Sequence, residues 1–141
     1  MRILIADDHT VVRSGLRAIL GTRRDWQVCA EAENGIEAVT FAKRVRPDVA
    51  VVDLNMPGLN GIEASAELTK ILPRVGVVVP TFDHSSALVS AILKSGALGD
   101  AIFPHLPCLS SYSFVLGNAG SPNLEVRAQL RLLAERMKRM L

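Results

Sequence analysis

Short apolar runs that alternate with amphipathic stretches most restrict the fold of this chain. The four runs expected to form strands are RILIA (2–6), WQVCA (26–30), DVAVV (48–52) and VGVVVP (75–80). The third and fourth are apolar almost throughout, which is typical of parallel strands that are covered on both faces. This alternation of strands with helices predicts an α/β fold with a mostly parallel sheet and right-handed crossovers.

Helical patterns occupy the gaps between these strands. In the first gap, apolar residues recur along one stripe at Val12, Leu16, Ile19 and Leu20. Segments 35–46 and 61–72 show a similar pattern and are expected to form two further helices, each ended by the proline that follows it. Another helix ending near Gly96 and a weaker fifth strand at 99–103 complete the pattern.

Composition narrows the class of protein. The 141 residues are 49% apolar and 21% charged, which is typical of a globular domain with its own core. A net charge of +2 gives no argument for nucleic-acid binding by the whole chain. No run reaches the ~18 apolar residues of a membrane span, and no secretory signal is present. Cys29 and Cys108 show no metal-ligand spacing, so a cytoplasmic protein with reduced thiols is expected.

Polar residues follow the predicted strands at matching places. Asp7 and Asp8 end the first strand, Asp53 ends the third and Thr81 ends the fourth. Ligands of open α/β sheets bind at the carboxyl ends of the strands, so these residues should meet in one crevice. Three carboxylates there repel one another unless a cation lies among them, and oxygen ligands with room for water suit Mg²⁺.

Each of these residues also has an ordinary structural explanation. Asp7 and Asp8 resemble a helix N-cap pair, Thr81 a cap at a strand end, and Asp53 the start of a turn before Pro57. Their joint occurrence at matching strand ends favours the metal site.

Three longer segments identify a family. The segments ILIADDHTVVRSGLRAIL, EAENGIEAV and PDVAVVDLNMPGLNGIEA resemble the receiver domain of two-component response regulators, of the CheY-like fold, in its NarL/FixJ branch. The match is ungapped from about residue 2 to 79 and thins from Thr81 to Gly99. It implies a doubly wound, five-stranded parallel sheet of order 2-1-3-4-5 flanked by helices, with a receiver core over 1–103.

The resemblance also implies roles for the strand-end residues. Asp53 would accept a phosphoryl group from the phosphohistidine of a sensor histidine kinase. Asp7, Asp8, Asp53 and the backbone carbonyl of Asn55 would hold Mg²⁺, and the Thr81 hydroxyl would contact the new acyl phosphate as a switch. Such a module is a signalling domain rather than an enzyme, with at most self-catalysed phosphotransfer and dephosphorylation.

Other functions fit less well. His9 lies beside the site, but the donor histidine of the family is on another protein, so no direct role is expected for it. A hydrolase with an aspartate nucleophile is disfavoured because Asn55 stands where a second acid would follow Asp53. A dinucleotide-binding domain is disfavoured because ADDHT replaces the glycine-rich turn after the first strand.

The last third departs from the family pattern. Phe103 stands where the family has a lysine, and Asp100 stands where it has a switch aromatic. His105 lies two residues further on and would be a poor substitute for the lysine. Pro80 would remove one hydrogen bond from an interior strand. These departures keep a second function open, a pseudo-receiver that acts as a phosphorylation-independent interaction domain.

Segment 104–121 occupies the place of a short loop and is expected to be an atypical loop or an insertion. An amphipathic helix is expected over 122–141, either as the last helix of the receiver or as a dimerisation helix. A rearrangement of the fifth strand and of this helix is an open alternative, and a shift of reading frame after about residue 98 would explain the same loss of pattern. The signal is expected to pass to a transcriptional output. DNA would be contacted only through an output domain that this chain does not include, and no contact of the protein with a membrane is expected.

Overall fold

The computed structural model describes residues 1–81 and 113–117, and the predictions for Asp100, Phe103, Cys108 and the helix at 122–141 lie outside these residues. Strands and helices alternate in the order β1 (Arg2–Ala6), α1 (Thr10–Leu20), β2 (Gln27–Ala32), α2 (Gly35–Val45), β3 (Val49–Val52), α3 (Gly61–Ile71), β4 (Gly76–Thr81) and β5 (Ser113–Gly117). The elements from β1 to β4 lie at the predicted places.

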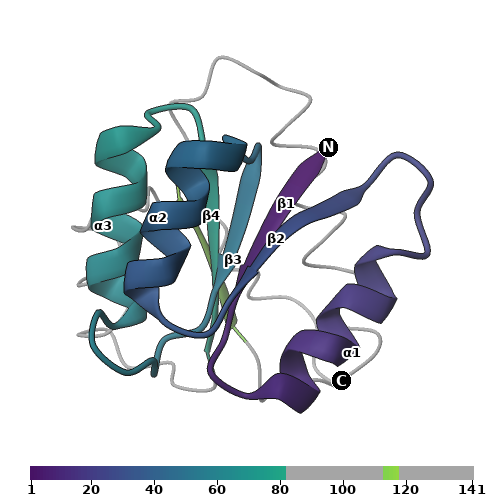
Figure 1. The fold of residues 1–141 in the computed structure, drawn as a ribbon, viewed down its shortest axis with the longest axis horizontal. Coiled ribbons are helices and arrows are strands. Elements are labelled where there is room, and N and C mark those ends of the chain that lie inside the picture. The colour runs from purple at the N-terminus through teal and green to yellow at the C-terminus, as the bar shows by residue number, and fades with distance from the viewer. Residues whose placement is uncertain (82–112, 118–141) are drawn as a thin grey trace.

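The sheet has the order β2-β1-β3-β4-β5 (Figure 1), and the order of its first four strands is as predicted. Strands β1 to β4 are mutually parallel, which confirms the doubly wound α/β architecture. The sheet is not parallel throughout, because β5 is antiparallel to β4. The pairing runs from Val77 with Gly117 to Thr81 with Ser113. Part of the segment expected as a loop is therefore a strand, while the strand predicted at 99–103 lies outside the described residues.

Helices cover both faces of the sheet (Figure 1). Because side chains alternate along a strand, β1, β3 and β4 each contribute to two cores. One core lies under α2 and α3 and includes Leu4, Ala6, Ala50, Val52, Val77 and Val79. The other lies under α1 and includes Ile3, Ile5, Val49, Val51 and Val78. The continuous apolar runs of β3 and β4 are thus explained by burial on two sides.

The buried stripe of α1 differs from the predicted one. The helix buries Arg13, Leu16 and Leu20, whereas Val12 is 47% exposed. Arg13 lies three residues before Leu16 and seven before Leu20, so it shares their face of the helix. A charged residue therefore occupies the place on the stripe that the hydrophobic pattern had assigned to Val12.

Pro80 does not interrupt the ladder between β3 and β4. The pairing of these strands ends at Val51 with Val78, and Pro80 lies beyond it, opposite Phe114 of β5. The predicted loss of a hydrogen bond therefore does not fall on the β3–β4 pairing. Among the described helices, none is long and apolar enough to cross a membrane.

Candidate functional site

The register of β1 and β3 brings two of the predicted acids together. Ala6 pairs with Val52, so both strands end at the same level. The backbone N–H of Asp53 then donates a hydrogen bond of 2.8 Å to the carbonyl of Ala6. Asp7 and Asp53 follow directly, each at the carboxyl end of a central strand.

Hydrogen bonds restrain the backbone of Asp7 and one of its two carboxylate oxygens. The residue is 6% exposed, and its N–H donates to the carbonyl of Ala32 at 3.1 Å. Its Oδ1 accepts the backbone N–H of His9 at 2.8 Å. Among residues 1–81, the hydrogen bond and the His9 contact of the Asp7 carboxylate fall on Oδ1, which leaves Oδ2 as the oxygen that would bind a ligand.

Asp8 and His9 complete an exposed cluster next to Asp7. The Nδ1 atom of His9 lies 2.8 Å from Oδ1 of Asp8 and 3.4 Å from Oδ1 of Asp7. One ligand atom from each of the three residues lies within 4.8 Å of the others. The sequence had placed His9 beside the site, but it gave no sign that the imidazole contacts both carboxylates.

Asp53 shows the electrostatic effect of this arrangement. Burial, followed by the negative charge of Asp7 and to a smaller extent that of Asp8, raises the pKa of the Asp53 carboxyl group. The backbone N–H groups of Asn55 and Leu54 oppose the rise, and that of Asn55 donates to Oδ2 at 3.1 Å. The three carboxylates therefore interact across two loops that are distant in sequence.

The loop after Asp53 is packed tightly against the start of α3. A Cβ atom on Gly61 would lie 2.2 Å from the carbonyl oxygen of Asp53, so only glycine fits there. The N–H of Gly61 also donates to the carbonyl of Leu54 at 2.9 Å. Gly58 has a φ of +77°, a conformation that glycine adopts without strain. The glycines of the Pro57-Gly58 and Asn60-Gly61 pairs thus allow the loop to turn and α3 to begin close to Asp53.

Arg13 is the residue near the site that the sequence analysis missed. Its Nη1 donates to the backbone carbonyl of Asp7 at 2.7 Å, and its Nη2 contacts Glu33 at 2.8 Å. A charged residue on the apolar stripe of a helix is a signal that could have revealed it.

The acids form a donor set that suits a divalent cation. Within the described part of the chain, no lysine or arginine forms an ion pair with the carboxylates of Asp7, Asp8 or Asp53. Burial first, and then the charges of Asp7 and Asp8, raise the pKa of Asp53, so these neighbours disfavour its ionisation. The ligand atoms that lie within 4.8 Å of one another belong to Asp7, Asp8 and His9, and Asp53 follows the neighbouring strand. Carboxylate oxygens with room for water are typical ligands of Mg²⁺. The residues present therefore fit the ion.

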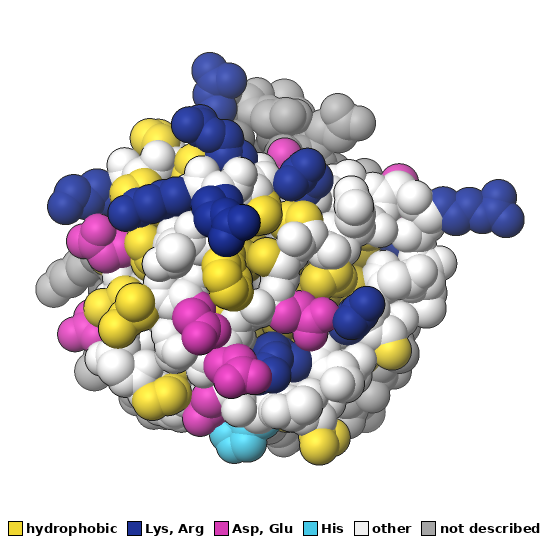
Figure 2. Space-filling model, viewed as in Figure 1, with side chains coloured by type: hydrophobic (Ala, Val, Ile, Leu, Met, Phe, Trp, Pro, Cys, Tyr) yellow, Lys and Arg dark blue, Asp and Glu magenta, His cyan; other side chains and the backbone are white. Residues whose placement is uncertain are grey.

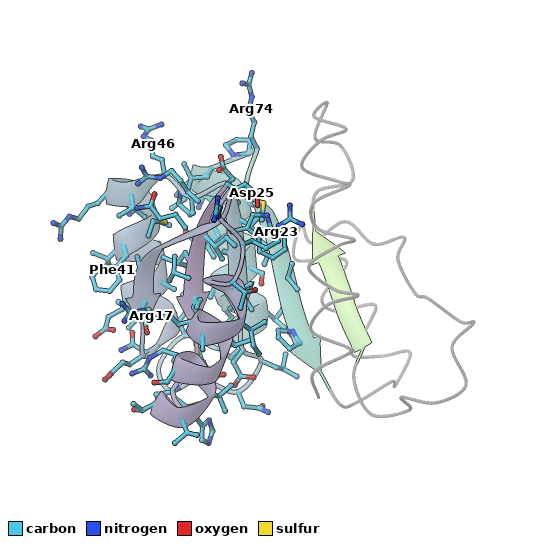
Figure 3. All side chains as sticks on the ribbon, turned by 90° about the vertical axis from the view of Figure 1, so that its right-hand side faces the viewer. Arg17, Arg23, Asp25, Phe41, Arg46 and Arg74 are labelled. Carbon is cyan, nitrogen blue, oxygen red and sulfur yellow. The ribbon has the colours of Figure 1, made fainter. Side chains whose placement is uncertain are left out.

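Charge is distributed unevenly along the strand direction. Figure 2 shows many of the lysine and arginine side chains toward one end of the molecule and the histidine, with several acidic side chains, toward the other, where some basic side chains lie among them. Arg46 and Arg74 project from the end at which the strands begin (Figure 3). Basic residues there also lie near helix C-termini, where they favour the helix dipole.

Thr81 ends β4 at the same edge as the acids, where it pairs in register with Ser113. Its backbone therefore lies where the sequence predicted a switch residue. The remaining atypical positions, Asp100 and Phe103, belong to the part of the chain that is not described.

A family model for the response regulator receiver domain matches residues 3–100. The chain belongs to this family. The receiver domain is 37% identical over 99 residues to the transcriptional regulatory protein DegU of Brevibacillus brevis, in a match covering 70% of this chain and 42% of DegU. The chain thus spans less than half the length of that relative.

Solved structures agree with this assignment. The signal receiver domain of the response regulator NarL from Mycobacterium tuberculosis is 31% identical, with a TM-score of 0.63, covering 67% of this chain and 77% of that one. The isolated receiver domain of RcsB from Salmonella enterica serovar Typhimurium, solved in the presence of the phosphomimetic BeF3⁻, is 28% identical, with a TM-score of 0.62, covering 67% and 71%. The chain is therefore a receiver domain of two-component response regulators of the transcriptional, NarL type.

Proposed function

We propose that this receiver domain accepts a phosphoryl group on Asp53 from the phosphohistidine of a sensor histidine kinase. One observation carries the proposal: the Asp53 carboxyl group is partly buried and lies in the electrostatic field of Asp7 and Asp8. Three carboxylates at the ends of neighbouring strands need a cation between them. Membership of the receiver family supplies the class of reaction.

The reaction can be written for the residues of this chain. A carboxylate oxygen of Asp53 attacks the phosphorus atom, and the phosphorus–nitrogen bond to the donor imidazole breaks. The electron pair of that bond stays on the imidazole nitrogen, which takes up a proton. The product on Asp53 is an acyl phosphate, and the transfer depends mainly on in-line positioning and on neutralisation of the phosphoryl oxygens.

Asp7, Asp8, Asp53 and the backbone carbonyl of Asn55 would hold Mg²⁺. The bound ion would neutralise charge on the phosphoryl oxygens and keep Asp53 ionised. The backbone N–H of Asn55, which donates to Oδ2 of Asp53 at 3.1 Å, orients that carboxylate. The Thr81 hydroxyl would contact the acyl phosphate and carry the signal to the following loop.

The output of the signal is transcriptional. A relative named as a transcriptional regulatory protein supports this, and an output domain outside this chain would contact DNA. We also propose that residues 1–103 form the receiver core and that residues 104–121 are an atypical loop or insertion. The helix proposed at 122–141 would be the surface through which a homodimer forms.

A second function follows from one feature of the sequence. The family has a lysine where this chain has Phe103, and no lysine or arginine occurs between Lys94 and Arg127. A pseudo-receiver would keep the fold and act by protein contacts without phosphorylation.

Phosphorylation by a small donor separates the two functions. Wild type and Asp53→Asn are incubated with acetyl phosphate and Mg²⁺ and then measured by intact mass spectrometry. The phosphoacceptor role predicts a gain of one phosphoryl group on wild type alone, and its disappearance when EDTA is present. Equal masses for the two proteins, together with no response of wild type to beryllofluoride, would leave the pseudo-receiver as the function.

A further inference from the structure

We propose that Arg13 is a positioning residue, which holds the Asp7–Asp8 loop in the geometry that binds the divalent cation. The inference rests on the proposed function and adds a residue to it. Arg13 lies on α1, and its guanidinium group would not touch the ion. It would act through Asp7.

The contacts of Arg13 are unusual for an arginine on a surface helix. The residue is only 7% exposed. Its Nη1 donates to the backbone carbonyl of Asp7 at 2.7 Å, and its Nη2 donates to Oε1 of Glu33 at 2.8 Å and to Oγ1 of Thr10 at 3.5 Å. A buried charge is costly unless it is paired and hydrogen-bonded, and these partners satisfy it.

The hydrogen bond from Arg13 to the backbone carbonyl of Asp7 adds to the other hydrogen bonds that restrain Asp7. The N–H of Asp7 is bound by Ala32, and Oδ1 accepts from the N–H of His9. With Arg13 on the carbonyl, the peptide groups on both sides of the Asp7 Cα atom are fixed. The remaining carboxylate oxygen then points in one direction, as a metal ligand requires.

The contacts of Arg13 with Asp7 and Glu33, here called the Arg13 clamp, are anchored at the Glu33 end as well. Glu33 lies in the loop between β2 and α2, and its N–H donates to Oε2 of Glu37 at 3.0 Å. The N–H of Glu37 donates to Oδ1 of Asn34, the N-cap of α2, at 2.8 Å. Arg13 therefore connects the Asp7 loop to the fixed start of a second helix.

Charge and geometry make opposite predictions for a substitution of Arg13. A guanidinium group near the acids repels a cation, so its removal would strengthen metal binding if charge alone mattered. A positioning role predicts weaker binding instead. Arg17 provides the matched control, because it lies one turn later on α1, is exposed, and pairs with Glu31 at 3.1 Å without contacting Asp7 (Figure 3).

The test compares Arg13→Met, Arg13→Lys and Arg17→Met by two readouts. In the absence of metal, amide hydrogen exchange by NMR should be faster for His9 in Arg13→Met and unchanged in Arg17→Met. In calorimetric Mg²⁺ titrations, Arg13→Met should bind about 10–100-fold more weakly, as for other residues that orient a ligand. Arg13→Lys should lie between, because one ammonium group cannot span both partners. Arg17→Met should bind as wild type or more tightly.

Each outcome decides a separate point. Equal exchange and equal or tighter Mg²⁺ binding in Arg13→Met would overturn the positioning role. A wild type that binds no Mg²⁺ would refute the proposed function, and the exchange data would then still show whether Arg13 holds the loop.

Should Arg13→Met not fold, Glu33→Gln is compared with Glu31→Gln. Each removes one negative charge from the partner of an α1 arginine. Weaker Mg²⁺ binding in Glu33→Gln alone supports the Arg13 clamp, and equal binding in the two variants overturns it.

Discussion

The backbone N–H of Asp53 donates a 2.8 Å hydrogen bond to the carbonyl of Ala6, so Asp7 and Asp53 leave β1 and β3 at the same level. This bond continues the parallel register in which Ala6 pairs with Val52. The closeness of Asp7 and Asp53 is therefore a consequence of strand pairing, and it has an energetic cost that can be measured.

We expect Asp53→Asn to be more stable than wild type at neutral pH in EDTA. Burial, and then the charge of Asp7, raises the pKa of Asp53 in the folded state, so its ionisation opposes folding. The advantage of the variant should be full above the folded-state pKa. It should shrink as the pH falls through that value and vanish below the unfolded-state pKa. Urea unfolding at pH 7 and pH 4 measures the difference, and equal stability at pH 7 would contradict the prediction.

Magnesium should stabilise wild type and have a smaller effect on Asp53→Asn. An ion that binds only the folded state adds about 2.7 kcal/mol when its concentration is one hundred times its Kd. Thermal unfolding with MgCl2 against NaCl of matched ionic strength measures this. Asp25→Asn is the control, because Asp25 pairs with Arg23 at the opposite end of the sheet. If Mg²⁺ raises the Tm of wild type and of Asp53→Asn equally, the ion does not bind at Asp53.

Gly61→Ala and Gly15→Ala should change stability in opposite directions. A Cβ atom on Gly61 meets the Asp53 carbonyl oxygen at 2.2 Å, so the start of α3 must move. A Cβ atom on Gly15 would meet no heavy atom of the described residues within 4 Å, and Gly15 lies inside α1, where alanine is better by about 0.5–1 kcal/mol. Chemical denaturation measures both changes. A neutral effect of Gly61→Ala would show that the loop after Asp53 has more room than these distances indicate.

Asn60→Ala should destabilise the protein by about 1 kcal/mol, because it removes the N-cap of α3. The side chain of Asn60 accepts from the N–H groups of Ile62 and Glu63, each at 3.0 Å. Asn60→Ser should retain most of the stability, since serine caps helices nearly as well. The free energy of unfolding distinguishes the two variants. No loss in Asn60→Ala would mean that the cap bond contributes nothing, and equal losses in both variants would mean that serine does not replace it.

The elements from β1 to β4 could be predicted because their signals are local. Apolar runs and helical stripes lie within about ten residues of sequence, and these strands and helices lie where the patterns placed them. The direction of β5 could not be predicted in this way. A short apolar segment pairs in either direction, and only its neighbours decide.

In the site, too, features with a local sequence signal could be predicted, and contacts between distant segments could not. Asp7, Asp8 and Asp53 were recognisable because parallel strands present their carboxyl ends at one edge. The contacts of His9 with both carboxylates, and of Arg13 with the Asp7 carbonyl, were not, because they depend on where each side chain points. The position of Arg13 on the face of Leu16 and Leu20 could be read from the sequence, but the groups that its guanidinium contacts could not.

The sequence by itself determined the α/β alternation, the family and the acids at the strand ends, because each depends on the order of residue types along the chain. Tertiary structure alone decided that Arg13 is buried, that β5 runs antiparallel and that the charge of Asp7 acts on Asp53. Those properties are set by distances between segments far apart in the chain, and only packing brings such segments together.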